Sequence, residues 1–87
     1  MNRRSKLEIL NDILDVIYNQ GEVKITHLMY KANLSYKKLK DYLEKLKEND
    51  MVEIDEKNNT VKLKEKGVEF LREFYRLKQF ADSFGLD

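Results

Sequence analysis

Apolar residues recur at helical spacing in the first segment of the chain. Ser5 and Glu8 stand three residues apart before this apolar run, which is the pattern of a capping box at a helix start. Gly21 fits the C-terminal cap of the same helix, because glycine tolerates the left-handed backbone found there. The pattern predicts an amphipathic helix whose inward face consists of Leu7, Leu10, Ile13, Leu14 and Ile17.

The segment after Gly21 changes period. Residues 23–25 alternate in polarity and predict a short strand, after which Thr26 is expected to cap a short helix over residues 27–32. Asn33 and Leu34 are expected to form a turn. Ser35 then caps a third predicted helix over residues 36–48, with an inward face made of Leu39, Tyr42, Leu43 and Leu46.

A hairpin and a long helix are predicted for the rest of the chain. Residues 51–54 and 60–63 both alternate, and residues 57–59 between them are turn formers that tolerate positive φ. The final helix extends from residue 65 to about residue 84 and contains no proline, although Gly67 weakens its first turn.

The order of these elements predicts the fold class. Two short helices joined by a tight turn form a helix-turn-helix, and a hairpin directly after the second helix forms a wing. We therefore expect an α+β, mostly α, winged helix-turn-helix with a long C-terminal helix, built as a single domain over residues 1–87. Other small α+β folds use the same elements, but the sharp turn at residues 32–35 and the place of the hairpin favour the winged helix.

Several blocks of the sequence resemble one family over nearly the whole chain. The blocks are residues 5–9 (SKLEI), 26–36 (THLMYKANLSY) and 42–46 (YLEKL), the hairpin, and the Glu-Lys-Gly of residues 65–67. They resemble the archaeal winged-helix family of small predicted transcriptional regulators, which includes the ten-kilodalton DNA-binding proteins of Sulfolobus. The resemblance implies dimers joined through the C-terminal helices, and double-stranded DNA bound by the helix-turn-helix and wing. The chain departs from the family in having Lys64 in place of the usual threonine, and its final helix is shorter than in the long coiled-coil members.

The start of the third helix carries the candidate DNA-binding residues. In a winged helix this helix enters the major groove, and its first turns face the base edges. The residues there are Ser35, Tyr36, Lys37, Lys38 and Lys40. Lysine binds phosphate as a point charge, and the helix has no arginine or glutamine and no asparagine before Asn49, so we expect phosphate-dominated binding with weak sequence preference. The alternative is an ordinary solvated face, which the acids Asp41 and Glu44 favour.

Two further basic segments are weaker candidates for phosphate contacts. Lys57 and Asn58 lie at the predicted wing tip, where an ordinary hairpin turn is an equal alternative. Arg3 and Arg4 belong to a basic N-terminal arm, which either reaches DNA or extends into solvent.

The final helix presents two apolar stripes. Val68, Leu71 and Tyr75 form one stripe, which the domain is expected to cover. The other stripe is expected to be exposed and to pair with a second copy as a coiled coil around a twofold axis; it consists of Phe70, Phe74, Leu77, Ala81 and Phe84. This divides the chain into a winged helix-turn-helix core over residues 1–64 and a dimerisation helix over residues 65–87. The alternative is that both stripes pack into the domain's own core.

Composition and charge narrow the remaining function classes. The net charge is +1, but residues 1–40 hold eight Lys and Arg against four acids, while residues 41–87 hold nine against twelve. Without cysteine the chain has no disulfide, thiolate zinc site or cysteine nucleophile, and His27 alone makes no histidine-rich metal site. It has no phosphate-binding glycine loop and no metalloprotease motif. We therefore expect no enzyme, metal or cofactor.

These observations lead to one function and one alternative. The sequence predicts a homodimeric double-stranded DNA-binding protein that acts as a transcriptional regulator or as a chromatin-type architectural protein. No apolar run approaches the ~20 residues that span a bilayer, so we expect a cytoplasmic, nucleoid-associated protein without a membrane partner. The alternative is a winged-helix module for protein–protein interaction that does not bind DNA.

Overall fold

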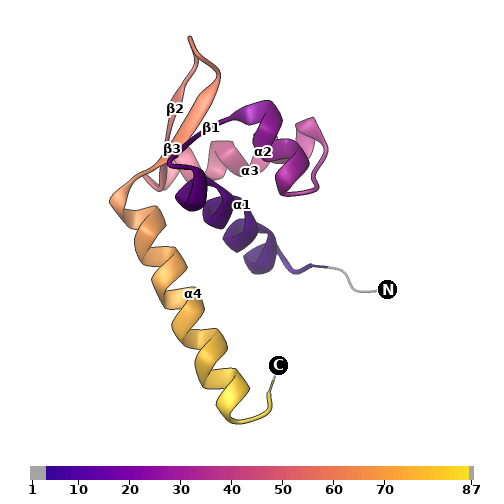
Figure 1. Ribbon diagram of the computed structural model, residues 1–87, viewed down its shortest axis with the longest axis vertical. Coiled ribbons are helices and arrows are strands. Elements are labelled where there is room, and N and C mark those ends of the chain that lie inside the picture. The colour runs from indigo at the N-terminus through magenta and orange to yellow at the C-terminus, as the bar shows by residue number, and fades with distance from the viewer. Residues whose placement is uncertain (1–3, 87) are drawn as a thin grey trace.

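Four helices and three short strands make up residues 4–86, the part of the chain that the computed structural model describes. In chain order they are α1 (Lys6–Gln20), β1 (Glu22–Lys24), α2 (Ile25–Lys31), α3 (Tyr36–Glu48), β2 (Val52–Asp55), β3 (Thr60–Leu63) and α4 (Glu65–Ser83). In Figure 1 the hairpin of β2 and β3 projects from one end of the molecule and α4 from the other. The expected winged helix-turn-helix with a long C-terminal helix is confirmed.

The three strands form an antiparallel sheet in the order β1-β3-β2. Val61 in the central strand pairs with Val23 on one side and with Ile54 on the other. Since side chains alternate across a strand, this register puts the apolar residues on one face and Glu22, Lys62 and Glu53 in a row on the other face. The apolar face packs against the helices, with α1 in contact with β3 and α3 in contact with β2.

Each of the first six elements contributes to one hydrophobic core. The helix α1 supplies Ile13, Leu14 and Ile17, and the remaining buried apolar residues are Val23, Ile25, Leu28, Ala32, Leu39, Leu43, Leu46, Val52 and Val61. Among residues 4–86, every buried polar side-chain atom has a hydrogen-bond partner. The inward faces predicted for α1 and α3 are largely confirmed. Tyr42 is only partly buried at the edge of the core, and Leu7 is 54% exposed, because the first turn of α1 extends past the core.

The predicted helix starts are confirmed where a side chain supplies the cap. The Ser5 hydroxyl accepts from the backbone N–H of Glu8 at 3.1 Å, and the Glu8 carboxylate accepts from the N–H of Ser5 at 2.8 Å, which completes the capping box. Gly21 ends α1 at φ 84° and ψ −71°, so its φ is positive as expected but its ψ lies outside the left-handed helical region. Asn33 in the turn between α2 and α3 and Asn59 in the wing both have φ of 56°.

The start of α2 differs from the prediction. The strand ends at Lys24, which is also the N-cap of α2 and makes no side-chain capping bond, so Thr26 is not a cap. The cause is tertiary. The N–H of Ile25, the first residue of α2, donates to the carbonyl of Asn59 in the wing at 3.0 Å. This hydrogen bond replaces a side-chain cap, so α2 follows β1 without a linker.

Candidate functional site

The lysines of α3 project from the side of the helix opposite the core. Ser35 begins the helix by accepting from the backbone N–H of Lys38 at 3.2 Å. Three leucines on the opposite side (Leu39, Leu43 and Leu46) are buried, which fixes the rotation of α3 about its own axis. All five candidate residues of the first turns are consequently exposed: Ser35, Tyr36, Lys37, Lys38 and Lys40. Their contact with DNA stays a prediction.

Tyr36 and Lys40 form a pair one turn apart on this exposed surface. The Lys40 Nζ lies 5.9 Å from the centroid of the Tyr36 ring, which is within cation–π range. The contact holds the Lys40 ammonium beside the first turn of α3. The carboxylates of Asp41 and Glu44 are also exposed on α3, so the helix presents both signs of charge.

Lys6 at the start of α1 lies beside two lysines of α3. Lys6 from α1 and Lys38 and Lys45 from α3 line one shallow hollow of about 200 Å³, together with Asp41 and Tyr42. Three ammonium groups and one carboxylate therefore share this surface. The sequence pattern alone does not predict that Lys6 lies beside α3, because local patterns give no information on contacts between residues more than thirty positions apart.

Arg4 is not a free arm residue. Its guanidinium forms an ion pair with Asp12 of α1 at 2.7 Å and donates to the carbonyl of Asn33 at 3.2 Å, in the turn between α2 and α3. Arg4 therefore ties the start of the described chain to α1 and to the helix-turn-helix. A role in phosphate binding stays a prediction. Arg3, the other residue of the expected arm, lies outside the described residues.

The wing tip is held together by its own side chains. The Asn58 amide donates to Asp55 at 2.8 Å, and the Asn58 backbone N–H donates to the same carboxylate at 3.2 Å. These hydrogen bonds favour the charged carboxylate, and they lower the pKa of Asp55 below its ordinary value. The amide of Asn58 is therefore engaged in the turn, whereas Lys57 is exposed at the tip and is the wing residue whose charge is available.

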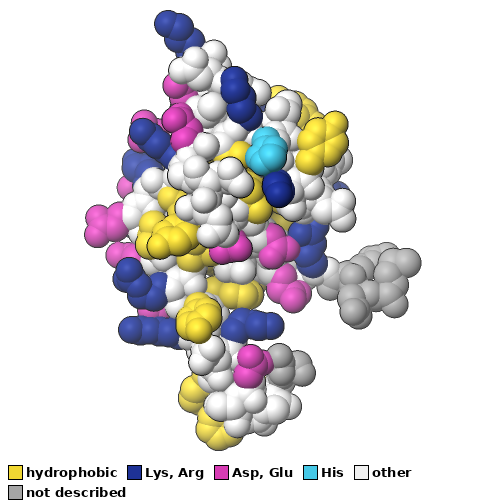
Figure 2. Space-filling view, in the orientation of Figure 1, with side chains coloured by type: hydrophobic (Ala, Val, Ile, Leu, Met, Phe, Trp, Pro, Cys, Tyr) yellow, Lys and Arg dark blue, Asp and Glu magenta, His cyan; other side chains and the backbone are white. Residues whose placement is uncertain are grey.

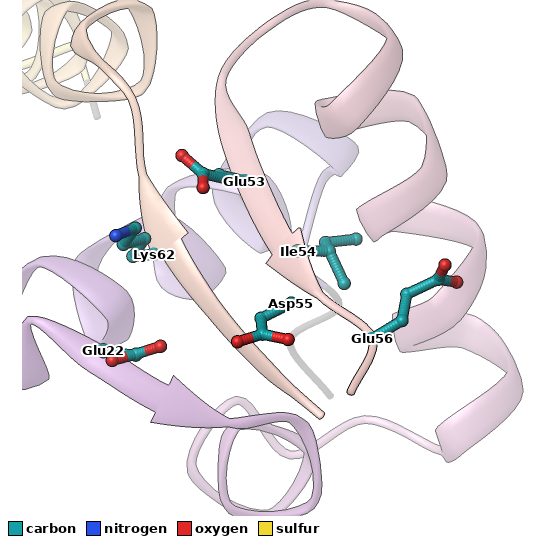
Figure 3. A pocket seen from close by; sticks show the side chains of 6 residues that line it. All are labelled: Glu22, Glu53, Ile54, Asp55, Glu56 and Lys62. Atoms are coloured by element: carbon teal, nitrogen blue, oxygen red, sulfur yellow. The ribbon is translucent and has the colours of Figure 1, made fainter. Parts of the chain in front are cut away.

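The outer face of the sheet is acidic. Four carboxylates (Glu22, Glu53, Asp55 and Glu56) and Lys62 line a hollow of about 330 Å³. In Figure 3 Lys62 lies between Glu53 and the pair of carboxylates of Glu22 and Asp55, while Glu56 points away from them. This face repels phosphate. The wing therefore differs in charge between its tip and its outer sheet face.

The final helix packs on α1 through a sector that lies between the two predicted stripes. Phe70 and Leu71 pack against the core, and Phe74 is half-buried beside Asn11 of α1. The expectation that Phe70 and Phe74 are exposed is therefore wrong, as is the expectation that Tyr75 is covered, since its side chain is exposed. The covered residues of α4 come from both predicted stripes, because the surface of α4 that contacts α1 crosses the boundary between the stripes.

The C-terminal turns of α4 carry an exposed apolar group that we call the terminal apolar surface. Its members are Leu77 (62% exposed), Phe80 (62%), Phe84 (63%) and Leu86 (71%). The rings of Phe80 and Phe84 contact each other with centroids 4.9 Å apart. Phe80 and Leu86 are additions to the predicted stripe, and Ala81 is partly buried next to them. Figure 2 shows apolar side chains at the lower end of the molecule, over the C-terminal end of α4.

A family model described as "Winged helix-turn-helix" matches residues 3–82. The chain belongs to the winged helix-turn-helix family. The match begins before α1 and ends one residue short of the end of α4, so it includes the hairpin and the long C-terminal helix. It confirms at the level of the family the resemblance that the sequence blocks carry.

Solved structures with the same winged helix-turn-helix fold include proteins from three organisms. A mutant of MepR from S. aureus has a TM-score of 0.75 and 11% identity, covering 87% of this chain and 61% of MepR. A MarR family transcriptional regulator from Silicibacter pomeroyi has a TM-score of 0.71 and 20% identity, covering 88% and 57%. Sso10a-2, a DNA-binding protein from Sulfolobus solfataricus, has a TM-score of 0.71 and 23% identity, covering 94% and 90%. At these identities the likeness concerns the fold, and the chain spans only about six tenths of the first two proteins.

No curated protein matches the sequence of this winged helix-turn-helix chain. Within residues 4–86, no group of three histidines, cysteines or acids is arranged to hold a metal ion. In the same residues no helix has the length and hydropathy of a membrane span. Among the described carboxyl groups, the pKa is lowered at Glu8, Asp50 and Asp55, each at a cap, a turn or an ion pair. These shifts have local structural causes.

Proposed function

We propose that this chain is a homodimeric protein that binds double-stranded DNA and acts as a transcriptional regulator or as a chromatin-type architectural protein of the nucleoid. The observation that carries the proposal is the row of exposed lysines on α3 (Lys37, Lys38 and Lys40), which starts directly after the turn of a helix-turn-helix. The proposal includes no catalytic activity, metal or cofactor.

The mechanism follows from the docking of this motif on duplex DNA. The N-terminal turns of a recognition helix face the base edges of the major groove. In α3 these turns present ammonium groups and two hydroxyls, from Ser35 and Tyr36, and these groups bind phosphate more readily than they discriminate bases. Lys6 and Lys45 extend the positive surface along the helix. Binding is therefore dominated by phosphate and weakly dependent on sequence.

The wing and the N-terminal segment supply secondary contacts in this proposal. Lys57 at the wing tip approaches the adjacent phosphates, with Asn58 behind it as the residue that shapes the turn. Arg4 acts mainly by holding the turn before α3, and Arg3 precedes it in the same basic segment. The acidic outer face of the sheet points away from the duplex.

The proposed dimer contact covers the terminal apolar surface. Four large apolar side chains that are each more than half exposed, at the end of one helix, are rarely left in water by a soluble monomer. A second copy related by a twofold axis covers all of them with one self-complementary contact. Leu77 and Ala81 lie in the middle of this contact, Phe80, Phe84 and Leu86 extend it, and the half-buried Phe70 and Phe74 form its edge.

A titration with generic duplex DNA tests the function. We expect binding at low salt, with the logarithm of the affinity falling linearly as the logarithm of the salt concentration rises, because bound lysines release condensed counterions. Two duplexes of equal length and different sequence should bind within a few-fold of each other. Absence of binding at low salt contradicts the proposal.

The rival function is a protein–protein interaction module that does not bind DNA. The exposed Asp41 and Glu44 on α3 favour it, since carboxylates that face phosphate lower the affinity for DNA. In the same titration this rival predicts no binding at any salt concentration.

A further inference from the structure

The first turn of α4 packs closely against Met51, which follows the end of α3. Gly67 in the first turn of α4 is buried, and a Cβ atom built on it lies 2.5 Å from the carbonyl oxygen of Met51 and 3.1 Å from a methyl carbon of Leu63. A separation of 2.5 Å is shorter than real Cβ atoms make, and the atom it meets is backbone. Glycine is therefore required here by the close approach of the Met51 carbonyl. A positive φ is not the reason, because the φ of Gly67 is not positive.

The same carbonyl of Met51 accepts a hydrogen bond from the backbone N–H of Lys64 at 2.9 Å. The Lys64 ammonium forms an ion pair with Asp50, which raises the pKa of Lys64 and lowers the pKa of Asp50. Two neighbouring residues, Asp50 and Met51, therefore hold the residues just before and inside the first turn of α4.

The other side of this junction is the last turn of α3. The N–H of Met51 donates to the carbonyl of Leu46 at 2.9 Å, and the N–H of Asp50 donates to the carbonyl of Lys47 at 3.0 Å. Asp50 itself has a φ of 63°, which reverses the chain after the helix. Backbone hydrogen bonds thus run from α3 to Met51 and from Met51 to Lys64, the residue just before α4.

We infer that Asp50, Met51, Lys64 and Gly67 are positioning residues that fix the direction of α4 relative to α3, and thereby set the length of duplex that the dimer spans. The inference rests on the proposed function, in which α3 binds DNA and the end of α4 joins two copies. An α-helix of the length of α4 is about 28 Å long. A tilt of about 10° at its first turn therefore moves its far end by about 5 Å, which changes the separation of the two α3 helices.

A distance measurement within one chain tests the junction without DNA. The chain has no cysteine, so Glu44→Cys on α3 and Gln79→Cys on α4 allow two spin labels at exposed positions. The labelled chain is diluted in excess unlabelled protein, so that only distances within one chain are measured. We expect Gly67→Ala to shift the mean distance, because the added methyl has to move away from the Met51 carbonyl.

Matched variants separate this effect from a loss of stability. Gly21→Ala strains a residue with positive φ at the end of α1, with no atom within 4 Å of the added carbon, so it destabilises the fold without touching the junction. Lys64→Gln is expected to broaden the distance distribution by removing the ion pair with Asp50. Lys66→Gln removes the same charge from a neighbouring exposed position whose interaction with Asp50 is weaker than that of Lys64, and it should leave the distribution unchanged. Should Gly67→Ala fail to fold, the Lys64→Gln and Lys66→Gln comparison decides.

The consequence for DNA is read from duplexes of increasing length. The wild-type dimer should gain affinity at the length where both α3 helices reach one duplex, by a factor of about 10²–10⁴. Gly67→Ala should move this threshold length and keep the affinity for shorter duplexes. An unchanged label distance, or a shifted distance with an unchanged threshold, overturns the inference. If the wild type binds no DNA at any length, the proposed function fails, while the label distances still decide whether the junction fixes α4.

Discussion

The Arg4 guanidinium donates to the carbonyl of Asn33 at 3.2 Å across 29 positions of the sequence, and it also pairs with Asp12 at 2.7 Å. Asn33 has a positive φ and lies two residues before the cap of α3. One side chain from outside the helix-turn-helix therefore supports the turn that aims the proposed DNA-binding helix.

Replacing Arg4 tests whether it acts by position or by charge. Arg4→Ala should lower the free energy of unfolding by about 0.5–1 kcal/mol, because the side chain is partly exposed and water weakens its contacts. Arg4→Lys keeps the charge but loses the fork that reaches two partners. Thermal unfolding and DNA titration of both variants separate the roles. If Arg4→Lys restores full DNA affinity without restoring stability, Arg4 contacts phosphate.

Removing lysines from α3 should weaken DNA binding without affecting the fold. Lys37→Ala with Lys40→Ala should lower the affinity for every duplex sequence and reduce the log–log salt slope by about 0.9 for each phosphate that is no longer neutralised. Both side chains are exposed, so the free energy of unfolding should change by about 0.5 kcal/mol or less. The matched control is Lys66→Ala with Arg72→Ala, which removes two exposed charges from α4. An equal loss of affinity in both double variants would show that net charge matters rather than α3.

Leu43 is 1% exposed on the buried side of α3, where a cavity is costly. Leu43→Ala should reduce the free energy of unfolding by about 2–5 kcal/mol, because the variant buries less apolar surface and leaves a cavity behind. Leu7→Ala is the matched control, because Leu7 is 54% exposed and should change stability by about 0.5 kcal/mol or less. Chemical denaturation of both variants measures the difference. Similar midpoints would mean that the assigned helix face is wrong.

Breaking the terminal apolar surface should separate the proposed dimer. Leu77→Glu places two carboxylates near each other across the twofold axis in apolar surroundings, and an unpaired buried charge costs several kcal/mol. Light scattering should give a monomer with an intact fold, and DNA affinity should fall by a factor of about 10²–10⁴, because only one α3 helix then binds each duplex. Gln79→Glu is the control, since Gln79 is exposed on the same helix but outside the surface. A monomeric variant with unchanged DNA affinity would refute the link between dimerisation and binding.

Three carboxyl groups predict how stability responds to acid. Hydrogen bonds from Ser5, Lys64 and Asn58 lower the pKa of Glu8, Asp50 and Asp55 respectively. A lowered folded-state pKa stabilises the fold above the unfolded pKa, and the contribution is lost as the pH falls through the folded-state value. The melting temperature should therefore fall below about pH 4, near the ordinary values of these groups.

The triple variant Glu8→Gln, Asp50→Asn and Asp55→Asn should show a shallower fall in melting temperature as the pH is lowered from about 5 to about 2. Lys64 is expected to lower stability at high pH. Its folded-state pKa is raised, so its contribution to the free energy of unfolding is lost as the pH rises through that pKa. An acid profile that is the same in the triple variant and the wild type would place the acid-sensitive groups elsewhere.

Local signals were enough to predict most of the fold. The caps at Ser5 and Ser35 and the turns at Asn33 and Asn59 are found where the sequence places them, because each depends on residues within a few positions. The exposure of the α3 lysines also follows from the spacing of three leucines on one helix. These features need no knowledge of the rest of the chain.

The features that sequence did not predict depend on distant contacts. The start of α2 is decided by the carbonyl of Asn59 in the wing, and the need for Gly67 is decided by the carbonyl of Met51. The covered sector of α4 is decided by where α1 lies, which is why Phe74 is half-buried and Phe80 is exposed. Helical spacing identifies a stripe, but it does not say which neighbour covers it.

The strand order also has a consequence for the folding pathway. β3 lies between β1 and β2, so the only partner of β1 is a strand about 38 positions away in the sequence. The hydrogen bond from Thr60 to Glu22 has the same sequence separation. The wing hairpin closes a short loop, whereas pairing β1 closes a long one at a greater cost in chain entropy. We therefore expect the hairpin to form early and β1 to join it late. Because the N–H of Ile25 donates to the carbonyl of Asn59 in the wing, we expect the first turn of α2 to become ordered only after the wing has formed.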